Sequence, residues 1–182
     1  MSDFYFYHNI YTCIGCCACQ AACKDHNNLP PGEFFRRVAE IRDPDTGKHH
    51  FYSGNCNHCE SPVCVAVCPN GAFYQAEDGT VLHDDGKCIG CGKCLWSCPY
   101  GAISLSRERG VAQKCSGCLE RRRQGQEPAC VAACVNRSLQ FGRTDGRCDE
   151  RPLLRTIPGI LPDAELTRPR LRIPVDPVKE QA

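Results

Sequence analysis

Cysteine is the residue type that could do chemistry in this sequence, which has 18 cysteines in 182 residues. Residues 88–99 read CIGCGKCLWSCP, in which three cysteines recur at every third position and a fourth follows four residues later. Bacterial ferredoxins bind 4Fe-4S clusters with the same cysteine run. Three cysteines so close together can reach three irons of a cubane, so the fourth iron needs a ligand from elsewhere in the chain.

The same spacing occurs three more times with small changes. Residues 56–69, CNHCESPVCVAVCP, insert two residues before the third cysteine, and residues 13–23, CIGCCACQAAC, lack the final proline. A fourth group combines CSGC at 115–118 with CVAAC at 130–134. Because a Gly-Ala turn follows both the second and the third group, in CPNGAF and CPYGAI, residues 56–103 are an internal duplication.

Two cysteines fall outside the repeated pattern. Superposing CIGCCACQAAC on CIGCGKCLWSC places Cys17 on Gly92, and Cys148 belongs to none of the groups. We interpret Cys17 as a small buried residue that fills space, and the alternative is an extra ligand or a redox-active thiol. Sixteen candidate ligands remain.

We expect the ligand sets to cross between groups. In two-cluster ferredoxins the last cysteine of each run binds the other cluster, and Pro69 and Pro99 turn the chain after such a cysteine. This rule predicts four 4Fe-4S clusters at four sites: site 1 (Cys13, Cys16, Cys19 and Cys134), site 2 (Cys23, Cys115, Cys118 and Cys130), site 3 (Cys56, Cys59, Cys64 and Cys98) and site 4 (Cys68, Cys88, Cys91 and Cys94).

The N-terminal sequence bears on the compartment and so on the state of the cysteines. The opening MSDFYFYHNIYT has neither the basic nor the apolar region of a signal peptide, and no apolar run is long enough to span a membrane. We expect a soluble chain without a signal of its own, either cytoplasmic, or exported folded with a signal-bearing partner, or held at a membrane by a partner. This expectation weakens the alternative of a disulfide-linked secreted protein.

Net charge argues against a nucleic-acid partner. An oxidised cluster with four thiolates carries about −2, so four clusters would take the formal charge from +1 to about −7. The 22 Lys and Arg residues then balance the clusters. The basic stretch at 120–123 is better interpreted as a solvated helix face or a partner contact.

Short elements must position the ligands. Residues 4–7, FYFY, predict a strand, residues 79–83 predict a hairpin arm, and short helices are expected at 95–97 and 119–124. Trp96 is expected to pack beside a cluster and exclude water. Because the core would consist mostly of clusters and loops, we expect an apoprotein that is largely unfolded.

The expected fold class is α+β, with two interleaved bacterial-ferredoxin-like units of two clusters each, rich in loops, with short helices and small β-hairpins. Residues 1–55 and 104–151 would form the outer unit and residues 56–103 the inner unit. Residues 152–182, with six prolines and no apolar periodicity, are expected to be an extended partner-binding tail. Its apolar residues are too many to leave in water, so we expect the tail to lie across another chain.

The sequence resembles the four-cluster, ferredoxin-like iron–sulfur subunits of molybdopterin oxidoreductases. Among them it is most similar to the B subunits of dimethyl sulfoxide reductases. The likeness spans roughly residues 4–175 and includes CKDHNNLPPGEFFRRV and PRLRIP besides the cysteine groups. The sequence differs from some family members at two positions. Val135 stands where a proline is common. Cys91 stands where some relatives have tryptophan and hold a three-iron cluster, so the resemblance implies a four-iron cluster in this chain. The family pairs its cysteines as sites 1 to 4 do.

The resemblance implies an electron-transfer subunit without a catalytic residue or direct substrate. Its partners would be a large molybdenum- or tungsten-bis-pterin catalytic subunit and a membrane anchor or another electron donor or acceptor. One alternative is a soluble polyferredoxin that serves a hydrogenase or a formate dehydrogenase. The other is a cysteine-rich zinc scaffold, which would have separated CxxC pairs rather than triplets.

Overall fold

The computed structural model describes residues 4–43, 47–143 and 152–175, and Cys148 lies outside them. The strands are β1 (Phe4–His8), β2 (Arg37–Arg42), β3 (His49–Gly54), β4 (Phe73–Gln75), β5 (Val81–His83), β6 (Ser104–Leu105), β7 (Ala112–Gln113), β8 (Leu139–Arg143), β9 (Leu153–Leu154) and β10 (Leu171–Pro174). The helices are α1 (Ala18–His26), α2 (Val63–Ala66), α3 (Lys93–Ser97), α4 (Leu119–Arg123) and α5 (Ala129–Ala132), and two 3₁₀ turns are η1 (Asp85–Lys87) and η2 (Ala164–Leu166). These few helices and small sheets confirm the mixed α+β class.

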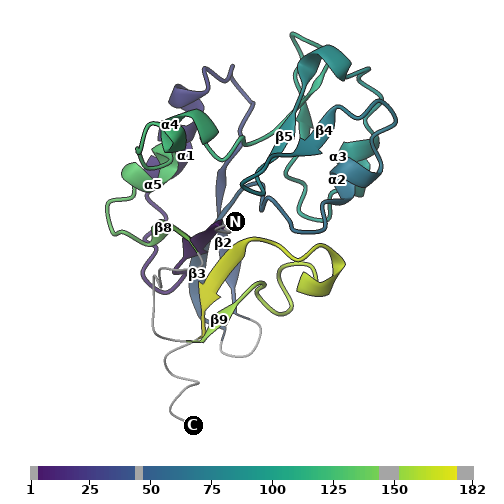
Figure 1. Ribbon diagram of the computed structural model, residues 1–182. Helices are drawn as coiled ribbons and strands as arrows, with labels where there is room; N and C mark the ends of the chain where they lie inside the picture. Colours follow the sequence, from purple (N-terminus) through teal and green to yellow (C-terminus); the bar gives the residue numbers. More distant parts are fainter. Residues whose placement is uncertain (1–3, 44–46, 144–151, 176–182) are drawn as a thin grey trace.

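A four-stranded sheet in the order β8-β1-β10-β9 lies below the helices in the view of Figure 1. β1 pairs antiparallel with β8 and parallel with β10, so it has a neighbour on each edge. All five β1 residues are buried, and the rings of Phe4 and Phe6 pack against Phe141 of β8. The strand predicted at residues 4–7 is therefore confirmed.

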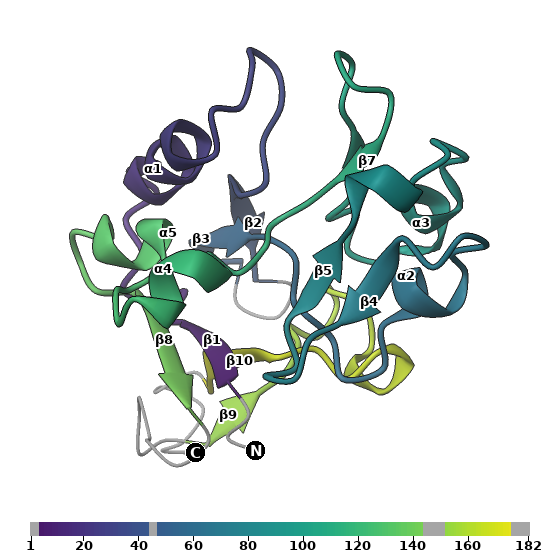
Figure 2. The ribbon, with the colours of Figure 1, turned by 45° about the horizontal axis from the view of Figure 1, so that its top comes forward.

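Two lobes stand on this sheet. Figure 2 shows α1, α4 and α5 on one side and α2, α3 and the hairpins β4–β5 and β6–β7 on the other. The predicted arm at 79–83 contains β5, and the predicted short helices correspond to α3 and α4. Among the described residues, no helix is both long and apolar enough to cross a membrane.

Two polar residues connect the lobes. The carboxylate of Glu33, in the loop after α1, accepts hydrogen bonds from the Arg107 backbone N–H at 3.1 Å and from the Gln113 side chain. From α4, the Arg122 guanidinium pairs with Asp78 at 2.8 Å. The stretch at 120–123 is thus only partly a solvated face, because Arg122 points into the molecule.

The hairpin β6–β7 belongs to the lobe of the duplicated groups. Ala112 packs in one core cluster with Phe73, Val81, Cys94 and Ile103. Residues 104–113 thus pack against residues 56–103, although the predicted boundary at residue 103 assigns them to the outer unit. The division into two interleaved units stays a prediction.

The C-terminal segment packs on its own chain rather than away from it. β10 adds to β1, β9 adds to β10, and Ile157, Leu171 and Ile173 are buried beside Ile10 (Figure 1). The inference that the apolar residues of this segment need a second chain to cover them is wrong for Ile157, Leu171 and Ile173, whereas Leu154 and Leu166 are exposed. The sequence missed this because a parallel pairing between the two ends of a chain leaves no local pattern. Partner contact by the tail stays a prediction.

Candidate metal centres

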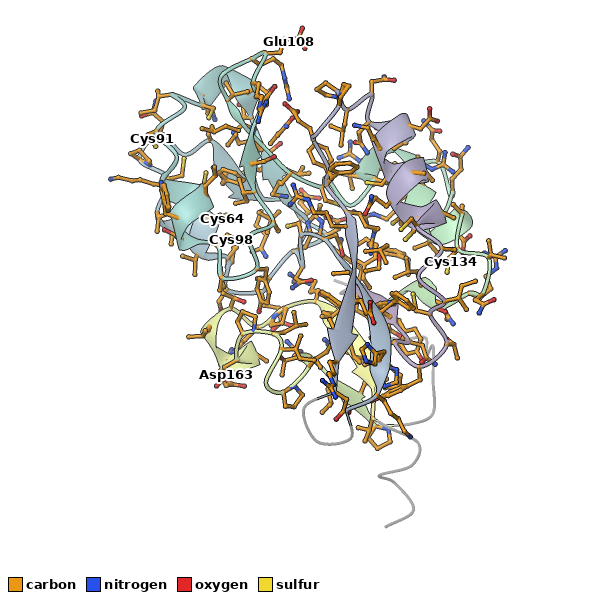
Figure 3. The ribbon with its side chains drawn as sticks, turned by 180° about the vertical axis from the view of Figure 1, so that it is seen from behind. Cys64, Cys91, Cys98, Glu108, Cys134 and Asp163 are labelled. Carbon is orange, nitrogen blue, oxygen red and sulfur yellow. The ribbon has the colours of Figure 1, made fainter. Side chains whose placement is uncertain are left out.

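Three of the four predicted ligand sets each surround a small cavity. The cysteines of site 1, of site 3 and of site 4 each line a separate cavity, and none of these three cavities mixes cysteines of two predicted sites. Figure 3 shows Cys64 and Cys98 of site 3 next to each other, although they come from different cysteine groups. In the same view Cys91 of site 4 and Cys134 of site 1 lie on opposite sides of the molecule.

The four cysteines of site 2 also lie close together. All of them are buried, with at most 7 % of each residue exposed. Burial raises the pKa of Cys23, and the neighbouring Cys115, Cys130 and Cys118 raise it further. The structure therefore gathers each of the four sets that the sequence groups, including the members that come from distant parts of the chain.

A left-handed residue shapes the loop between the first two cysteines of each group. The residue directly before the second cysteine of each CxxC motif has a positive φ in all four groups: 68° at Gly15, 67° at Gly90, 66° at Gly117 and 43° at His58. Glycine adopts this conformation without steric cost, which explains the recurring CxGC. In the second group the same turn is made by a buried histidine.

A second left-handed residue precedes α1, α3 and α4. Cys17 (φ 60°) precedes α1 and Gly92 (φ 74°) precedes α3, so the two residues that the sequence superposes also have the same backbone conformation. Cys17 is exposed, so the interpretation of Cys17 as buried filler is wrong. Trp96 is 90 % exposed, so the prediction that it packs beside a cluster and excludes water is also wrong.

Backbone amides point at several of the sulfurs. The Ala72 N–H lies 3.2 Å from Cys68 Sγ and the Leu139 N–H lies 3.3 Å from Cys134 Sγ. Burial would raise the pKa of Cys68, but the N–H groups of residues 70–73 together lower it. Hydrogen bonds of this kind stabilise a thiolate, which is the form of cysteine that binds a metal.

Burial favours the protonated thiol at several other ligand candidates. Burial raises the pKa of Cys64 to about 12 and that of Cys59, Cys94 and Cys118 to about 11. A bound metal would instead hold them as thiolates. All 17 cysteines of the described residues are free, so no disulfide competes for them there. The donor chemistry of the four sets thus fits an iron–sulfur cluster.

The cysteines of each set are arranged around a space larger than a single metal ion. Within residues 4–43, 47–143 and 152–175, no three His, Cys, Asp or Glu side chains converge as they would around a single metal ion. A cubane is larger than one ion, and its four ligands lie correspondingly further apart. The cavities of sites 1, 3 and 4 are lined in this way.

Comparisons with known proteins agree with this donor set. Residues 47–144 match the family described as the 4Fe-4S dicluster domain. The chain is 39 % identical over 183 residues to the B subunit of the anaerobic dimethyl sulfoxide reductase of Escherichia coli (strain K12), a match that covers 94 % of this chain and 88 % of that protein. It is 41 % identical over 150 residues to the thiosulfate reductase electron transfer subunit PhsB of Salmonella typhi (79 % and 78 %). It is 36 % identical over 162 residues to the formate dehydrogenase iron–sulfur subunit of Wolinella succinogenes (77 % and 81 %).

Proposed function

Because this chain belongs to the 4Fe-4S dicluster family of electron-transfer subunits of oxidoreductase complexes, we propose that it relays electrons through four 4Fe-4S clusters. The clusters would lie at sites 1 to 4, bound by the crossed cysteine sets given above. The observation that carries the proposal is the gathering of four cysteines at each site, three from one group and one from another. We propose a molybdenum- or tungsten-bis-pterin catalytic subunit as one partner and a membrane anchor or another redox protein as the second.

Contacts between neighbouring cysteines support the site order 1-2-3-4. Cys19 of site 1 and Cys130 of site 2 are close enough for their charges to interact, and so are Cys115 of site 2 and Cys56 of site 3. Cysteines of sites 3 and 4 pack around one shared core cluster. The order 1-2-3-4 supports a relay in which each site exchanges electrons with its neighbours.

The protein holds the relay in place and sets its potentials. A bound 4Fe-4S cluster would supply a one-electron couple, and hydrogen bonding, charge and exposure tune such couples over about −700 to +450 mV. The amides that donate to Cys68 and Cys134 would favour the more negative, reduced state. No proton is consumed when one electron enters at one end and another leaves at the opposite end.

Sites 1 and 4 each have one exposed cysteine, whereas no cysteine of sites 2 and 3 is exposed, which supports one partner at each end. The second residue of the first CxxC is isoleucine in the end groups, with Ile14 57 % and Ile89 61 % exposed, whereas Asn57 in the site 3 group is 3 % exposed. Cys16 of site 1 and Cys91 of site 4 are exposed as well. Electrons can thus pass to other chains at sites 1 and 4.

Metal analysis and electron transfer test this function together. We expect the anaerobically purified chain to contain about sixteen irons with equal acid-labile sulfide and no zinc, as four cubanes require. When the substrate of the copurified catalytic subunit is added, that subunit should either reoxidise dithionite-reduced clusters, if its substrate is an oxidant, or reduce oxidised clusters, if its substrate is a reductant. Zinc in place of iron, or clusters that exchange no electrons with the working catalytic subunit in either direction, would refute the proposal.

A further inference from the structure

A guanidinium is buried between sites 1 and 2. Arg36 is only 2 % exposed, and its Nη1 donates to the Ser53 carbonyl oxygen at 2.8 Å and to the Ser53 hydroxyl oxygen at 2.9 Å. The Phe6 ring centroid lies 5.9 Å from the guanidinium carbon. No carboxylate among the described residues forms an ion pair with Arg36, and burying a charge without a counter-charge is costly.

The cysteines of both sites supply the opposite charge. On one side, the positive charge of Arg36 opposes the rise that burial causes in the pKa of Cys130 in site 2. On the other, the Ser53 hydroxyl lies 3.3 Å from Cys19 Sγ of site 1. Since the Ser53 oxygen accepts from Arg36, its hydrogen is free to point at the sulfur. The charge of Arg36 thus acts on a ligand of site 2, and a single hydroxyl links Arg36 to a ligand of site 1.

We propose that Arg36 is a positioning residue that raises the reduction potentials of the clusters at sites 1 and 2 and thereby sets the step between them. The inference rests on the proposed function, because it needs clusters at these sites. Reducing a cluster by one electron adds a negative charge, and a fixed cation in a poorly solvated interior stabilises the reduced form. The hydrogen bonds to sulfur act in the same direction, since sulfur is a better acceptor when the cluster is reduced.

A second buried cation provides a comparison at the next junction. Lys114 is 6 % exposed, and its Nζ donates to the Cys115 carbonyl oxygen at 2.8 Å and to the Val81 carbonyl oxygen. Burial raises the pKa of Cys56 and Cys64 in site 3, and the Lys114 ammonium opposes that rise. Removing this charge should therefore affect sites 2 and 3 and leave site 1 unchanged.

The test is a redox titration followed by electron paramagnetic resonance, with the full chain in its native complex. Iron and acid-labile sulfide are measured first. If the wild-type chain contains no clusters, the proposed function is refuted. If the clusters are present but the substitution leaves their reduction potentials unchanged, only this inference is refuted. Arg36→Met should make reduction of two clusters at least tenfold less favourable, about 59 mV per tenfold for a one-electron couple. Lys114→Met should lower the reduction potentials of the clusters at sites 2 and 3, so that only the site 2 cluster is affected by both substitutions.

Two substitutions serve as controls. Arg36→Lys keeps the charge and should retain most of the wild-type potentials. Arg37→Met removes one positive charge at the adjacent, exposed position, where water screens it, and should move no cluster by more than a small fraction of the Arg36→Met shift. Equal shifts for Arg36→Met and Arg37→Met, or a uniform shift of every cluster, would contradict the assignment.

Ser53→Ala provides a second test in case the Arg36→Met variant does not fold or does not acquire its clusters. It leaves the guanidinium in place and removes only the hydroxyl between Arg36 and Cys19. One cluster, at site 1, should then become harder to reduce while the others keep their potentials. Wild-type potentials at every site in Ser53→Ala would overturn the proposed hydrogen-bond link between Arg36 and Cys19.

Discussion

Cys17 occupies a backbone position that suits glycine better than any other residue. Its φ of 60° is left-handed, and the equivalent residue before α3 is Gly92. A non-glycine residue in this conformation costs about 1 kcal/mol or somewhat more. The thiol donates a hydrogen bond to the Gly15 carbonyl oxygen at 3.4 Å, and because a thiol is a weak donor this bond does not offset the cost.

We therefore expect Cys17→Gly to stabilise the cluster-loaded chain by about 1 kcal/mol. The denaturant concentration at which the visible cluster absorbance is lost should rise, and the iron content should stay the same. A matched Cys16→Gly variant, which removes a site 1 ligand, should lose iron. Iron loss in Cys17→Gly as well would show that Cys17 is a ligand.

His8 makes folding stability depend on pH. Its side chain is buried in β1, and neither ring nitrogen has a hydrogen-bond partner in the described residues. Burial, and then the charge of Arg36, lower the pKa of His8 from 6.5 to about 3. Below pH 6.5 the unfolded chain therefore binds a proton that the folded chain binds only near pH 3. The folded state loses stability as the pH falls through this window.

The loss attributable to His8 should be about 1.4 kcal/mol per pH unit between roughly pH 6 and pH 3. His8→Phe removes the titrating ring, so its stability should fall less steeply with acid than that of the wild type. Denaturant midpoints at a series of pH values measure the difference. His26→Gln, at an exposed histidine, should keep the wild-type slope. If His8→Phe has that slope too, the buried neutral histidine is not its cause.

At the scale of elements, the sequence predicts what local patterns determine. FYFY has the residue types of a buried strand, and each cysteine loop is followed by a helix of a few residues, as α3 and α4 show. The pairing of β10 with β1 depends on residues far apart in the chain, so no local pattern indicated it. The proline-rich composition of the segment suggested an extended tail that lies across another chain, although the buried residues of β10 contribute to the core of this chain.

Ile173 in β10 shows how much the C-terminal segment contributes to stability. It is 1 % exposed and packs with Ile10, Ile157 and Leu171. Ile173→Ala should destabilise the chain by about 2–5 kcal/mol, because it leaves a cavity in this core. Leu166→Ala, at a residue that is 61 % exposed, should change stability by less than about 0.5 kcal/mol. Denaturation of both variants in the cluster-loaded state measures the effects, and equal losses would mean that the segment does not pack on the sheet.

For the molecule as a whole, the cysteine repeats predict the sets that the structure gathers, because spacing constrains which sulfurs can surround one cluster. The same repeats say nothing about Arg36 or Lys114. FFRRV contains two arginines, and only the fold shows that Arg36 is buried between two sites while Arg37 faces solvent. The exposure of Cys16 and Cys91 at the end sites is likewise a property of the folded chain.

Contact with a partner at site 4 should depend on the apolar surface around it. Trp96 and Ile89 are 90 % and 61 % exposed and flank the exposed Cys91. Trp96→Ser with Ile89→Ser should weaken copurification of one partner at least tenfold without lowering the iron content. The matched pair Ile14→Ser with Val135→Ser, at site 1, should weaken a different partner instead. Loss of the same partner in both double variants, or of none, would contradict one partner at each end.

Substituting Cys98, Cys94 and Cys64 by serine, one at a time, tests most directly whether each cluster is held by cysteines of two groups. The electron paramagnetic resonance spectrum of each reduced variant shows which cluster signal is lost or altered. Cys98→Ser and Cys64→Ser should affect the same signal and Cys94→Ser a different one, because Cys98 lines the site 3 cavity with Cys64. If Cys98→Ser instead affects the signal that Cys94→Ser affects, the ligands do not cross and the four sites as described here do not exist.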